Sequence, residues 1–284
     1  MPCESPRWLR NKTFEGAVAI VTGGAHGIGR ALCEALANHG AIVTIADIDC
    51  DTAQQLALTL TRAGHRVEAV MLDVSRASDV ERIVGDVASR HGRLDFIFNN
   101  AAVAVAGELR DLSPRHFQRV IAVNVLGVVH GTMAAYRLML RQQAGHIINV
   151  SSITGLLPSP LLTAYSATKH AVVGFSTALR IEAATLGVSV SVACPGLVDT
   201  QIHERTEYLN VRKEDFLAQL PRRLMVTPAQ AARAILHGVA RNQPIIIHPL
   251  SARLGWWLYR LCPALVEKLM QRTVRQFRKI RVAN

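Results

Sequence analysis

The glycine-rich segment Thr22-Gly23-Gly24-Ala25-His26-Gly27-Ile28-Gly29 is the strongest indication of the fold of this chain. It follows a short apolar run, Ala17–Val21, that is typical of a buried strand, and it opens the helical pattern Ile28–His39. Glycines let the backbone turn sharply and approach a pyrophosphate closely, and the helix start offers free N–H groups to phosphates. A plain tight turn between a strand and a helix is the alternative interpretation. We expect Gly23, Gly27, Ile28 and Gly29 to contact a dinucleotide.

The rest of the chain alternates between apolar strands and helices, which is typical of a parallel sheet covered on both faces. Further strands are predicted at Ala41–Ala46, Val67–Leu72, Leu94–Phe98, His146–Val150, Val188–Ala193 and Ile245–His248. Helices are predicted at Thr52–Ala63, Ala77–Arg90, Pro114–Gln142, Thr163–Leu186 and Pro228–Arg241. This order predicts a single-domain, doubly wound (Rossmann-type) α/β fold over residues 16–250. An N-terminal extension (1–15) and a C-terminal helical extension (251–284) flank it.

The composition indicates a folded protein of a reducing compartment. Hydrophobic residues make up 50% of the 284 residues, enough for a full core. The five cysteines have neither metal nor redox spacing, so we expect free thiols, no metal site and a cytoplasmic location. The first 16 residues contain no apolar stretch, and we find no run of about 18 apolar residues. We therefore expect neither a signal peptide nor a membrane-spanning helix.

A carboxylate ends the second predicted strand. Asp47 stands where an acid binds both ribose hydroxyls of the adenosine half of a dinucleotide, and its charge repels the 2′-phosphate of NADP. The next residue is Ile48 rather than Arg, so no cation waits there for that phosphate. These residues predict NAD rather than NADP, although a protonated His26 in the turn weakens the inference. The alternative is a solvated turn acid that caps the next helix.

Three polar residues around the fifth strand suggest acid–base chemistry. Tyr165 and Lys169 are four residues apart, so both project from one face of the helix. Ser152 ends the preceding strand, at the edge where ligands bind in this architecture. The alternative is ordinary: an exposed Tyr–Lys pair on a helix and a Ser in a turn.

The chemistry needs these three residue types. Reduction of a ketone requires a proton donor, and oxidation of an alcohol requires a base. A tyrosine has a pKa of about 10, and lowering it to about 7 takes roughly 4 kcal/mol. The ammonium of Lys169 can supply much of this stabilisation, so we expect it to lower the pKa of Tyr165. Ser152 would hold the substrate oxygen by a hydrogen bond.

In combination these motifs resemble the short-chain dehydrogenase/reductase family over about residues 15–250. The turn matches its T-G-x-x-x-G-x-G pattern, and Tyr165 and Lys169 match its Y-x-x-x-K motif. The resemblance implies an NAD(P)-dependent enzyme in which Lys169 also holds the nicotinamide ribose. It assigns further cofactor contacts to Asp73, Val74, Asn100, Ala101, Pro195, Val198 and Thr200. Ala102 departs from the family's N-N-A-G motif, which affects only the local loop geometry.

The resemblance also implies a set of catalytic residues. Asn124 matches the family's helix Asn, which completes a proton relay through the Lys and a water. A buried, hydrogen-bonded structural Asn is the compatible alternative. The implied catalytic residues are Ser152, Tyr165, Lys169 and Asn124. Ser151 is the weaker candidate serine because its spacing to Tyr165 is one residue too long.

The segment after Ser152 bears on the substrate. Residues 153–162 are markedly apolar and contain no Arg or Lys that could clamp a carboxylate or phosphate. We therefore expect Ser152, Leu156, Leu157 and Tyr165 to bind a hydrophobic secondary alcohol or ketone, of steroid, fatty-chain or aromatic type. The alternative is that these leucines only pack a loop. Residues 201–226 are expected to form a mobile lid over the substrate.

The basic charge is concentrated at the C-terminus. Residues 251–284 carry eight Lys and Arg residues against one Glu, and they supply +7 of the formal net charge of +11. Leu254, Trp257, Leu258 and Leu261 have helical spacing, and after Pro263 further apolar residues could continue the stripe. A basic amphipathic helix with Trp can lie on an anionic membrane surface. Alternatively the stripe packs on its own domain or on a second subunit. No recognition motif accompanies the charge, so we expect no nucleic-acid binding.

Two functions from different classes fit this sequence. The first is an active dehydrogenase or ketoreductase, and the second is a dinucleotide-sensing protein that keeps the fold without turnover. The complete set of Ser, Tyr, Lys and Asn residues favours the first. The family resemblance also implies a homo-oligomer, a dimer or a tetramer, formed through the long helices 114–142 and 163–186.

Overall fold

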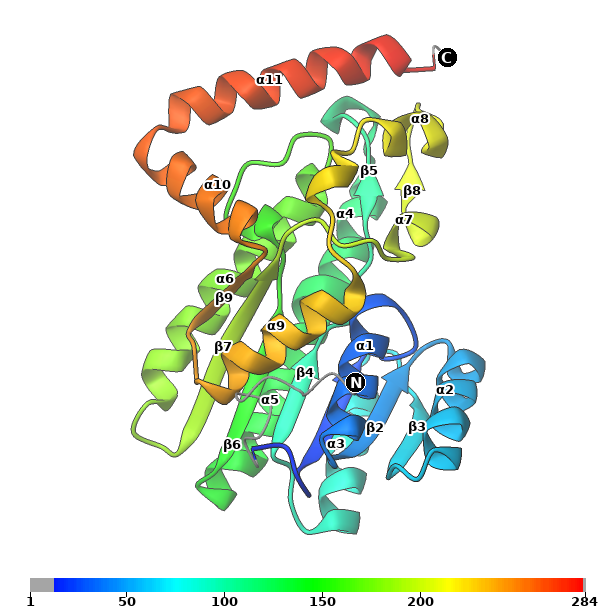
Figure 1. The fold of residues 1–284 in the computed structure, drawn as a ribbon, viewed down its shortest axis with the longest axis vertical. Helices are drawn as coiled ribbons and strands as arrows, with labels where there is room; N and C mark the ends of the chain where they lie inside the picture. Colours follow the sequence, from blue (N-terminus) through cyan, green and yellow to red (C-terminus); the bar gives the residue numbers. More distant parts are fainter. Residues whose placement is uncertain (1–12, 283–284) are drawn as a thin grey trace, which may run out of the picture.

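The computed structural model describes residues 13–282, and its centre is a seven-stranded parallel sheet (Figure 1). The strand order is β3-β2-β1-β4-β6-β7-β9. The strands are β1 (Val18–Thr22), β2 (Ile42–Asp47), β3 (Val67–Met71), β4 (Phe96–Asn99), β6 (Gly145–Val150), β7 (Val188–Pro195) and β9 (Ile245–His248). The order reverses between β1 and β4, and the loops beyond the carboxyl ends of these strands frame a crevice there.

Helices α1 (Gly27–Asn38), α2 (Cys50–Arg62) and α9 (Pro228–Ala240) cover one face of the sheet (Figure 1). Their buried side chains, such as Leu36, Leu56 and Ile235, pack against Val21 and Ile45 of the central strands. Helix α9 begins at a capping box formed by Thr227 and Gln230, in which each residue accepts a backbone N–H of the other.

The other face is covered by α3 (Ala77–His91), α5 (Gly127–Gln142) and α6 (Thr163–Ala183). Their core contains Ile83, Ala135 and Met139 beside Ile97 and Ile147 of the sheet. The single helix predicted over 114–142 consists of α4 (Pro114–Ile121), a π-helical turn at Ala122–Leu126, and α5. The π turn contains Asn124 and borders the cleft through Val123, and such turns are frequent at functional sites.

The helical run Pro114–Gln142 is long and apolar enough to cross a membrane by length and composition alone. It is not an unbroken apolar run, since polar residues such as Asn124, His130 and Thr132 interrupt it. Its apolar residues Val128, Ala135 and Met139 are buried in the core of the domain. Packing against the sheet therefore accounts for the composition of this helix.

A small cap stands above the carboxyl edge of the sheet. It is built from β5 (Val105–Ala106) paired with β8 (Glu207–Tyr208), and from α7 (Ile202–Arg205) and α8 (Lys213–Ala218). Short 3₁₀ turns at Leu109–Asp111 and Arg222–Leu224 complete it. Most of this cap comes from the predicted lid segment, residues 201–226.

Two helices follow β9 and confirm the predicted C-terminal helical extension. Helix α10 (Leu250–Leu261) leads away from the sheet, and α11 (Pro263–Ile280) returns across the cap (Figure 1). The ring of Phe277 is buried beside Leu161 and Val211, and it meets the ring of Phe216 edge-on at a centroid distance of 6.3 Å. The C-terminal helix is thus partly packed on its own domain.

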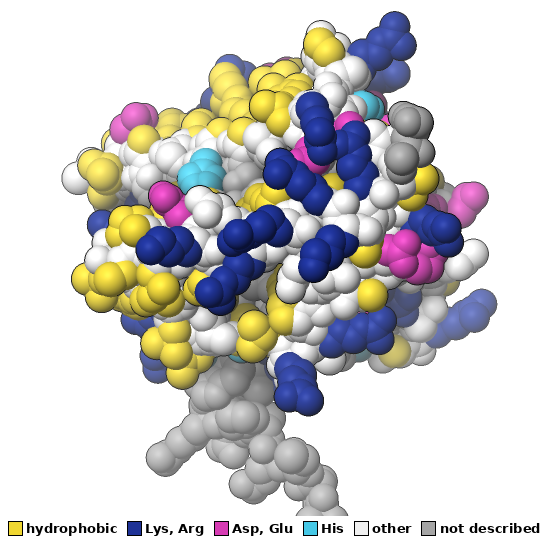
Figure 2. Space-filling model, turned by 90° about the horizontal axis from the view of Figure 1, so that it is seen from above, with side chains coloured by type: hydrophobic (Ala, Val, Ile, Leu, Met, Phe, Trp, Pro, Cys, Tyr) yellow, Lys and Arg dark blue, Asp and Glu magenta, His cyan; other side chains and the backbone are white. Residues whose placement is uncertain are grey.

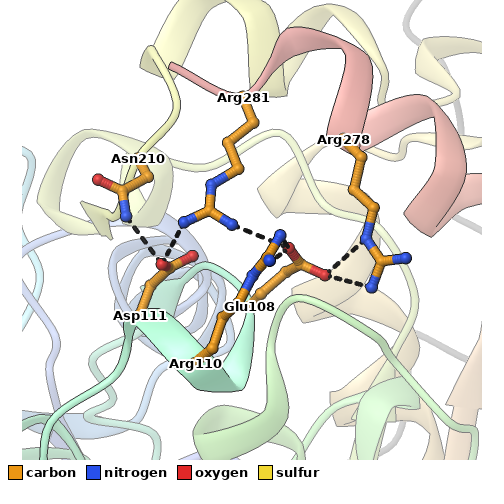
Figure 3. A network of polar contacts seen from close by, with 6 residues as sticks. All are labelled: Glu108, Arg110, Asp111, Asn210, Arg278 and Arg281. Carbon is orange, nitrogen blue, oxygen red and sulfur yellow. Dashed lines mark hydrogen bonds and ion pairs between the residues drawn. The ribbon is translucent and has the colours of Figure 1, made fainter. Parts of the chain in front are cut away.

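A network of ion pairs fixes the end of α11 to the cap (Figure 3). The carboxylate of Glu108 accepts hydrogen bonds from Arg278 Nε at 2.9 Å and Nη2 at 2.7 Å, and it also pairs with Arg110 and Arg281. Arg281 reaches Asp111 as well. The Arg278 hydrogen bonds, followed by Arg110, hold the pKa of Glu108 below its usual range.

The fold class is therefore confirmed: seven predicted strands form one parallel sheet with helices on both faces. The division into residues 1–15, 16–250 and 251–284 stays a prediction. Residues 1–12 of the predicted N-terminal extension, including Cys3, lie outside the described residues.

The substitution Phe277→Ala is expected to release α11 from the cap. Removal of a fully buried ring costs about 3 kcal/mol, and here that cost falls on the docking of one helix. Amides of residues 263–280 should then exchange with solvent about 100-fold faster, while amides of the central strands keep their protection. Leu269→Ala, at a side chain that is already exposed, is the control. Unchanged exchange in α11 would contradict the packing described here.

Candidate functional site

A cleft of about 350 Å³ opens at the carboxyl edge of the sheet, where the strand order reverses. The glycine turn lies at its floor, the ends of β2 and β3 lie at one end, and the cap covers the other. The predicted site residues that line this cleft are Gly23, Gly27, Ile28, Asp47, Asp73, Val74, Asn100, Ala101, Ser152, Tyr165, Lys169, Pro195, Val198 and Thr200.

The glycine turn leaves no room for side chains. Gly23 has φ +63°, and a Cβ on it would lie 2.8 Å from Ala101 Cα. A Cβ on Gly29 would lie 2.0 Å from the carbonyl oxygen of Gly23, so Gly29 shapes the turn from behind and does not line the cleft. Only glycine fits these two positions.

The start of α1 faces the cleft with its backbone N–H groups free. His26 precedes the helix without a side-chain cap, and no acidic residue stands in the first turn. Free N–H groups and the helix dipole favour an anion at this point. The residues present therefore fit the pyrophosphate of a dinucleotide.

Asn100 connects the turn to the neighbouring strand. Its side-chain Nδ2 donates to the carbonyl oxygens of Thr22 at 3.0 Å and Gly23 at 3.1 Å. The hydroxyl oxygen of Thr22 accepts the backbone N–H groups of Asn100 and Ala101. These bonds hold the ends of β1 and β4 together where the cleft opens. They are present even though Ala102 replaces the glycine of the N-N-A-G motif.

Asp47 is oriented by the backbone around it. Its Oδ2 accepts the N–H of Ala25 at 2.9 Å, and its Oδ1 accepts the N–H of Asp49 at 3.0 Å. The side chain is almost fully buried yet borders the cleft. The two N–H groups hold this carboxyl group at the end of the cleft where we expect the adenosine ribose.

The adenosine end also contains a cation that the sequence did not reveal. Arg205, from helix α7 of the lid, donates to Asp49 Oδ2 at 2.8 Å, and His26 Nε2 lies 2.8 Å from the same oxygen. A His26 Nε2–H that donates to Asp49 cannot accept from Arg205, so their 2.7 Å approach is a close contact. Gln201 completes the cluster at His26 Nδ1.

This cluster corrects the expectation that no cation waits near Asp47. Arg205 and His26 line the cleft, and 156 residues separate Arg205 from Asp49 along the chain. Sequence spacing gives no signal for such a pair, since the lid must fold back over the turn first. The hydrogen bond from His26 is the main reason that the pKa of Asp49 lies far below its usual range.

The third strand contributes Asp73 and Val74 to the same end. Asp73 Oδ1 accepts the hydroxyl of Ser75 at 2.7 Å and its backbone N–H at 3.0 Å. The Ser75 hydroxyl is the main cause that lowers the pKa of Asp73. Val74 is buried, and a Cβ on Gly127 would lie 2.7 Å from its Cγ2, so α5 packs closely here.

Ser152 and Tyr165 meet at the centre of the cleft. The Ser152 hydroxyl is close enough to the phenol of Tyr165 to lower its pKa, and the Ser152 Oγ accepts the backbone N–H of Thr154 at 3.2 Å. Ser151 points away, because its hydroxyl donates to the carbonyl oxygen of Lys169. The geometry therefore selects Ser152 as the serine next to the tyrosine.

Lys169 lies on α6, one turn after the tyrosine, and its side chain reaches the end of β6. Its Nζ donates to the carbonyl oxygen of Val150 at 2.9 Å and lies 5.4 Å from the centroid of the Tyr165 ring. Only 1% of the residue is exposed. Burial lowers the pKa of Lys169 to about 8, so the side chain is mostly charged at neutral pH.

The pKa of Tyr165 departs from our expectation. Burial raises it to about 12, and the hydrogen bond from Ser152 acts in the opposite direction. Lys169 does not lower the pKa of Tyr165 in this structure, because its ammonium faces the Val150 carbonyl and not the phenol oxygen. The phenol is therefore a proton donor at neutral pH.

Asn124 lies behind these residues rather than in the cleft. It is fully buried, its Oδ1 accepts the N–H of Val103 at 2.9 Å, and its Nδ2 donates to the Val103 carbonyl and to Thr168. These bonds join the π turn to α6 one residue before Lys169. The described contacts are those of a structural Asn, and a proton relay through it stays a prediction.

The predicted substrate residues Leu156 and Leu157 do not line the cleft. Leu156 packs against the buried cluster of Val128 and Val172, and Leu157 lies beside Gly255 of α10. Thr154 and Leu162 of the same segment take their place at the wall. The apolar character of residues 153–162 therefore reflects loop packing more than ligand contact.

The lid supplies the substrate end of the cleft. Apolar walls come from Val103, Ala104, Ala106, Leu162, Leu197, Ile202, Tyr208, Phe216 and Leu220. The rings of Tyr208 and Phe216 lie 5.2 Å apart and are backed by Phe277 of α11. Thr154 Oγ1 is buried at this wall and has no hydrogen-bond partner among the residues of 13–282. Sequence spacing could not connect these segments.

This chain is similar to known oxidoreductases over most of its length. The short chain dehydrogenase family matches residues 17–208. The putative oxidoreductase SadH of Mycobacterium tuberculosis is 32% identical over 269 residues, which are 93% of this chain and 98% of SadH. The probable oxidoreductase EphD of the same organism is 39% identical over 196 residues. That match covers 69% of this chain but only a third (33%) of the length of EphD.

Solved structures give the same result. A short-chain dehydrogenase/reductase from Burkholderia phymatum, solved in complex with NAD, superposes with a TM-score of 0.81 at 29% identity. The superposition covers 89% of this chain and 96% of that chain. The gox2181 structure superposes with a TM-score of 0.74 at 27% identity. With its cofactor turn and its Tyr–Lys pair at one cleft, this chain belongs to the short-chain dehydrogenase family.

Proposed function

We propose that the protein is an oxidoreductase that transfers a hydride between NAD(H) and a hydrophobic secondary alcohol or ketone. The single observation that carries this proposal is the meeting of Ser152, Tyr165 and Lys169 in the cleft that holds the glycine turn. A silent dinucleotide sensor would not need an acid–base group there. The NAD bound by the Burkholderia relative supports the class of cofactor.

The side chains divide the work at the substrate oxygen. Ser152 holds this oxygen, and the phenol of Tyr165 gives it a proton in reduction or takes one in oxidation. The buried ammonium of Lys169 favours the phenolate only when it moves toward the tyrosine oxygen, since it faces Val150 in the described protein. The dinucleotide would supply the position that accepts or donates the hydride.

Charge and polarity at the substrate end support a neutral, apolar substrate. The lining residues there are mainly aliphatic and aromatic, and apart from the catalytic Lys169 the only Lys or Arg among the lining residues is Arg205, which faces Asp49 at the other end. Such a wall has no cation for a carboxylate or a phosphate. His203 and Thr206 are polar residues at this wall, and burial lowers the pKa of His203. Steroid, fatty-chain and aromatic alcohols all fit this description.

The preference for NAD over NADP is supported by Asp47. Its carboxylate is fixed by two backbone N–H groups at the adenosine end, where it would meet a 2′-phosphate with repulsion. Arg205 does not offset this repulsion, because its guanidinium is already paired with Asp49. NADP would bind less well in this arrangement.

We also propose a cytoplasmic homo-oligomer, a dimer or a tetramer. The outer faces of the helices that we expect at the interface carry exposed apolar side chains, among them Ile121, Leu126, Met133 and Ile181. Exposed apolar patches of this kind commonly mark contacts between subunits.

Activity is tested with purified protein, NAD⁺ or NADP⁺, and a panel of short, long-chain, steroidal and aromatic alcohols. Tyr165→Phe is expected to lower kcat at least 100-fold, since the acid–base group is lost. Binding of NADH, followed by its fluorescence, should change less than threefold. Tyr136→Phe on α5, outside the cleft, is the matched control. Full activity in Tyr165→Phe would assign the proton transfer to another group.

The stability of the protein tests the burial of Lys169. Burial lowers the pKa of Lys169 from 10.5 to about 8, which reduces the free energy of unfolding at neutral pH by about 3 kcal/mol. The hydrogen bond to the Val150 carbonyl raises that free energy by about 1 kcal/mol. Lys169→Met is therefore expected to raise the free energy of unfolding at pH 7 by about 2 kcal/mol while turnover is lost.

The pH dependence has a definite sign. Between about pH 8 and 10.5 the unfolded lysine holds its proton and the folded one does not, so the wild type gains stability as pH rises. The advantage of Lys169→Met should shrink over this range, as measured by urea unfolding. Lys268→Met, at an exposed lysine, should show no such trend. A constant difference across this range would show that Lys169 is not buried in its charged form.

Cofactor preference tests the two acids at the adenosine end. Asp47→Asn/Asp49→Asn is expected to raise kcat/KM for NADP relative to NAD at least tenfold, because it removes the repulsion and frees Arg205 and His26. Asparagine keeps the N-cap of α2 that Asp49 provides. Asp79→Asn on α3 is the control. An unchanged cofactor ratio would place the 2′-position elsewhere.

A further inference from the structure

Helices α10 and α11 present an apolar face to solvent. The exposed members are Leu250, Leu254, Trp257, Leu258 and Leu261 on α10, and Leu265 and Leu269 on α11. The side chain of Leu261 is 76% exposed and that of Trp257 48%. Their spacing of three or four residues places them on one side of each helix. Both helices therefore carry a stripe that the domain does not cover.

The same helices carry cations beside this stripe. On α10, Arg253 and Arg260 precede Leu254 and Leu261 by one position, and on α11 Lys268 precedes Leu269 in the same way. One position is about 100° around a helix, so the cations flank the stripe on a constant side. Arg272, Arg275 and Lys279 continue the basic side of α11. This is the pattern of an amphipathic helix at an interface.

Packing on the domain occupies a different side of α11. Val266 and Phe277 are buried, and Arg278 and Arg281 are bound to Glu108 and Asp111 (Figure 3). These contacts fix the orientation of the helix without covering Leu265 and Leu269. One side of α11 therefore packs on the domain, and the other side stays available for contact with a surface outside the protein.

The remaining cations have no carboxylate partner. Among the residues that the structure describes, Arg253, Arg260, Lys268, Arg272, Arg275 and Lys279 form no ion pair, while Arg260 lies over the ring of Trp256. Figure 2 looks down on this end of the molecule and shows many Lys and Arg side chains among apolar groups, with few carboxylates. The face is positive as well as apolar.

This charge argues against a second copy of the chain as the occupant. A two-fold contact places the same patch against itself, so that like charges meet. A bilayer with anionic headgroups instead supplies an apolar layer for the leucines and phosphates for the cations. The chemistry of the face fits a membrane surface.

We infer that the stripe and flanking cations of α10–α11 form a docking surface for an anionic lipid bilayer. The leucines enter the boundary between the headgroups and the acyl chains, Trp257 lies at the level of the headgroups, and the six cations contact lipid phosphates. The chain does not span the bilayer through these helices, since each is amphipathic.

Docking would place the cleft close to the lipid. Phe277 of α11 backs Phe216 at the wall of the cleft, and Leu157 of the segment after Ser152 lies beside Gly255 of α10. A hydrophobic substrate dissolved in the bilayer would reach the lid at this point. This last step rests on the proposed function, whereas lipid binding itself does not.

Sedimentation with vesicles tests the surface without any substrate. The full chain is mixed with vesicles of phosphatidylcholine alone, or of phosphatidylcholine with phosphatidylserine. Binding is expected only to the anionic vesicles, and it should fall at least tenfold when salt rises from about 0.1 M to about 0.5 M. Equal binding to both vesicles would overturn the electrostatic part of the proposal.

Matched pairs of variants locate the surface. Arg272→Gln/Arg275→Gln is expected to weaken binding about 25-fold, at about fivefold for each cation. Arg62→Gln/Arg233→Gln removes two exposed cations from α2 and α9, and it should bind within about threefold of wild type. Equal losses in the two pairs would mean that net charge alone drives binding, which overturns the proposed surface.

A second pair tests the apolar stripe. Leu254→Gln/Leu261→Gln is expected to weaken binding at least tenfold, whereas Leu58→Gln/Met71→Gln, with comparably exposed side chains elsewhere, should not. Circular dichroism and NADH binding confirm that each variant is folded. The proposal fails if no chain binds anionic vesicles, or if the stripe variant instead dissociates a dimer in sedimentation velocity. Turnover of a soluble alcohol should be unchanged in these variants, which separates this result from the proposed function.

Discussion

The site depends on one buried ammonium. Lys169 is held by a single described hydrogen bond to the Val150 carbonyl, and its desolvation works against folding at neutral pH. Only a well-packed sheet can keep a charge in this position, since isolated burial of a cation is costly. Polar groups that reduce stability and are retained beside a cleft are typical of functional sites. The rest of the cleft is arranged around this cation and the tyrosine above it.

The pKa values of this pair describe a resting state. Burial raises the pKa of Tyr165 and lowers that of Lys169, so at neutral pH the phenol keeps its proton and the lysine is still mostly charged. Both shifts arise from desolvation, which disfavours the charged form of either group. The Ser152 hydrogen bond is the only described contact that favours the phenolate. In this state, proton donation requires less rearrangement than proton abstraction.

The lid and the C-terminal helices form one connected structure above the cleft. Phe277 backs Phe216, which lines the cleft, while Arg278 and Arg281 fix the same helix to Glu108 and Asp111. The ion pair of Arg205 with Asp49 ties the other side of the lid to the end of β2. The walls of the substrate end therefore depend on three segments that are distant in sequence: the lid, helix α11 and the segment of Glu108 and Asp111. Changes in any of them would alter which alcohols fit.

The strand–helix order, the glycine turn and the Tyr–Lys spacing could all be predicted from the sequence, because each depends on local patterns of a few residues. Prediction from the sequence failed where contacts join distant segments: Leu156 proved to be loop packing, and Arg205 reached Asp49 from the lid. The direction of the Tyr165 pKa shift also required the tertiary structure, since burial and the orientation of the lysine decide it. Local spacing fixes which side chains share a face, but only packing determines what surrounds them.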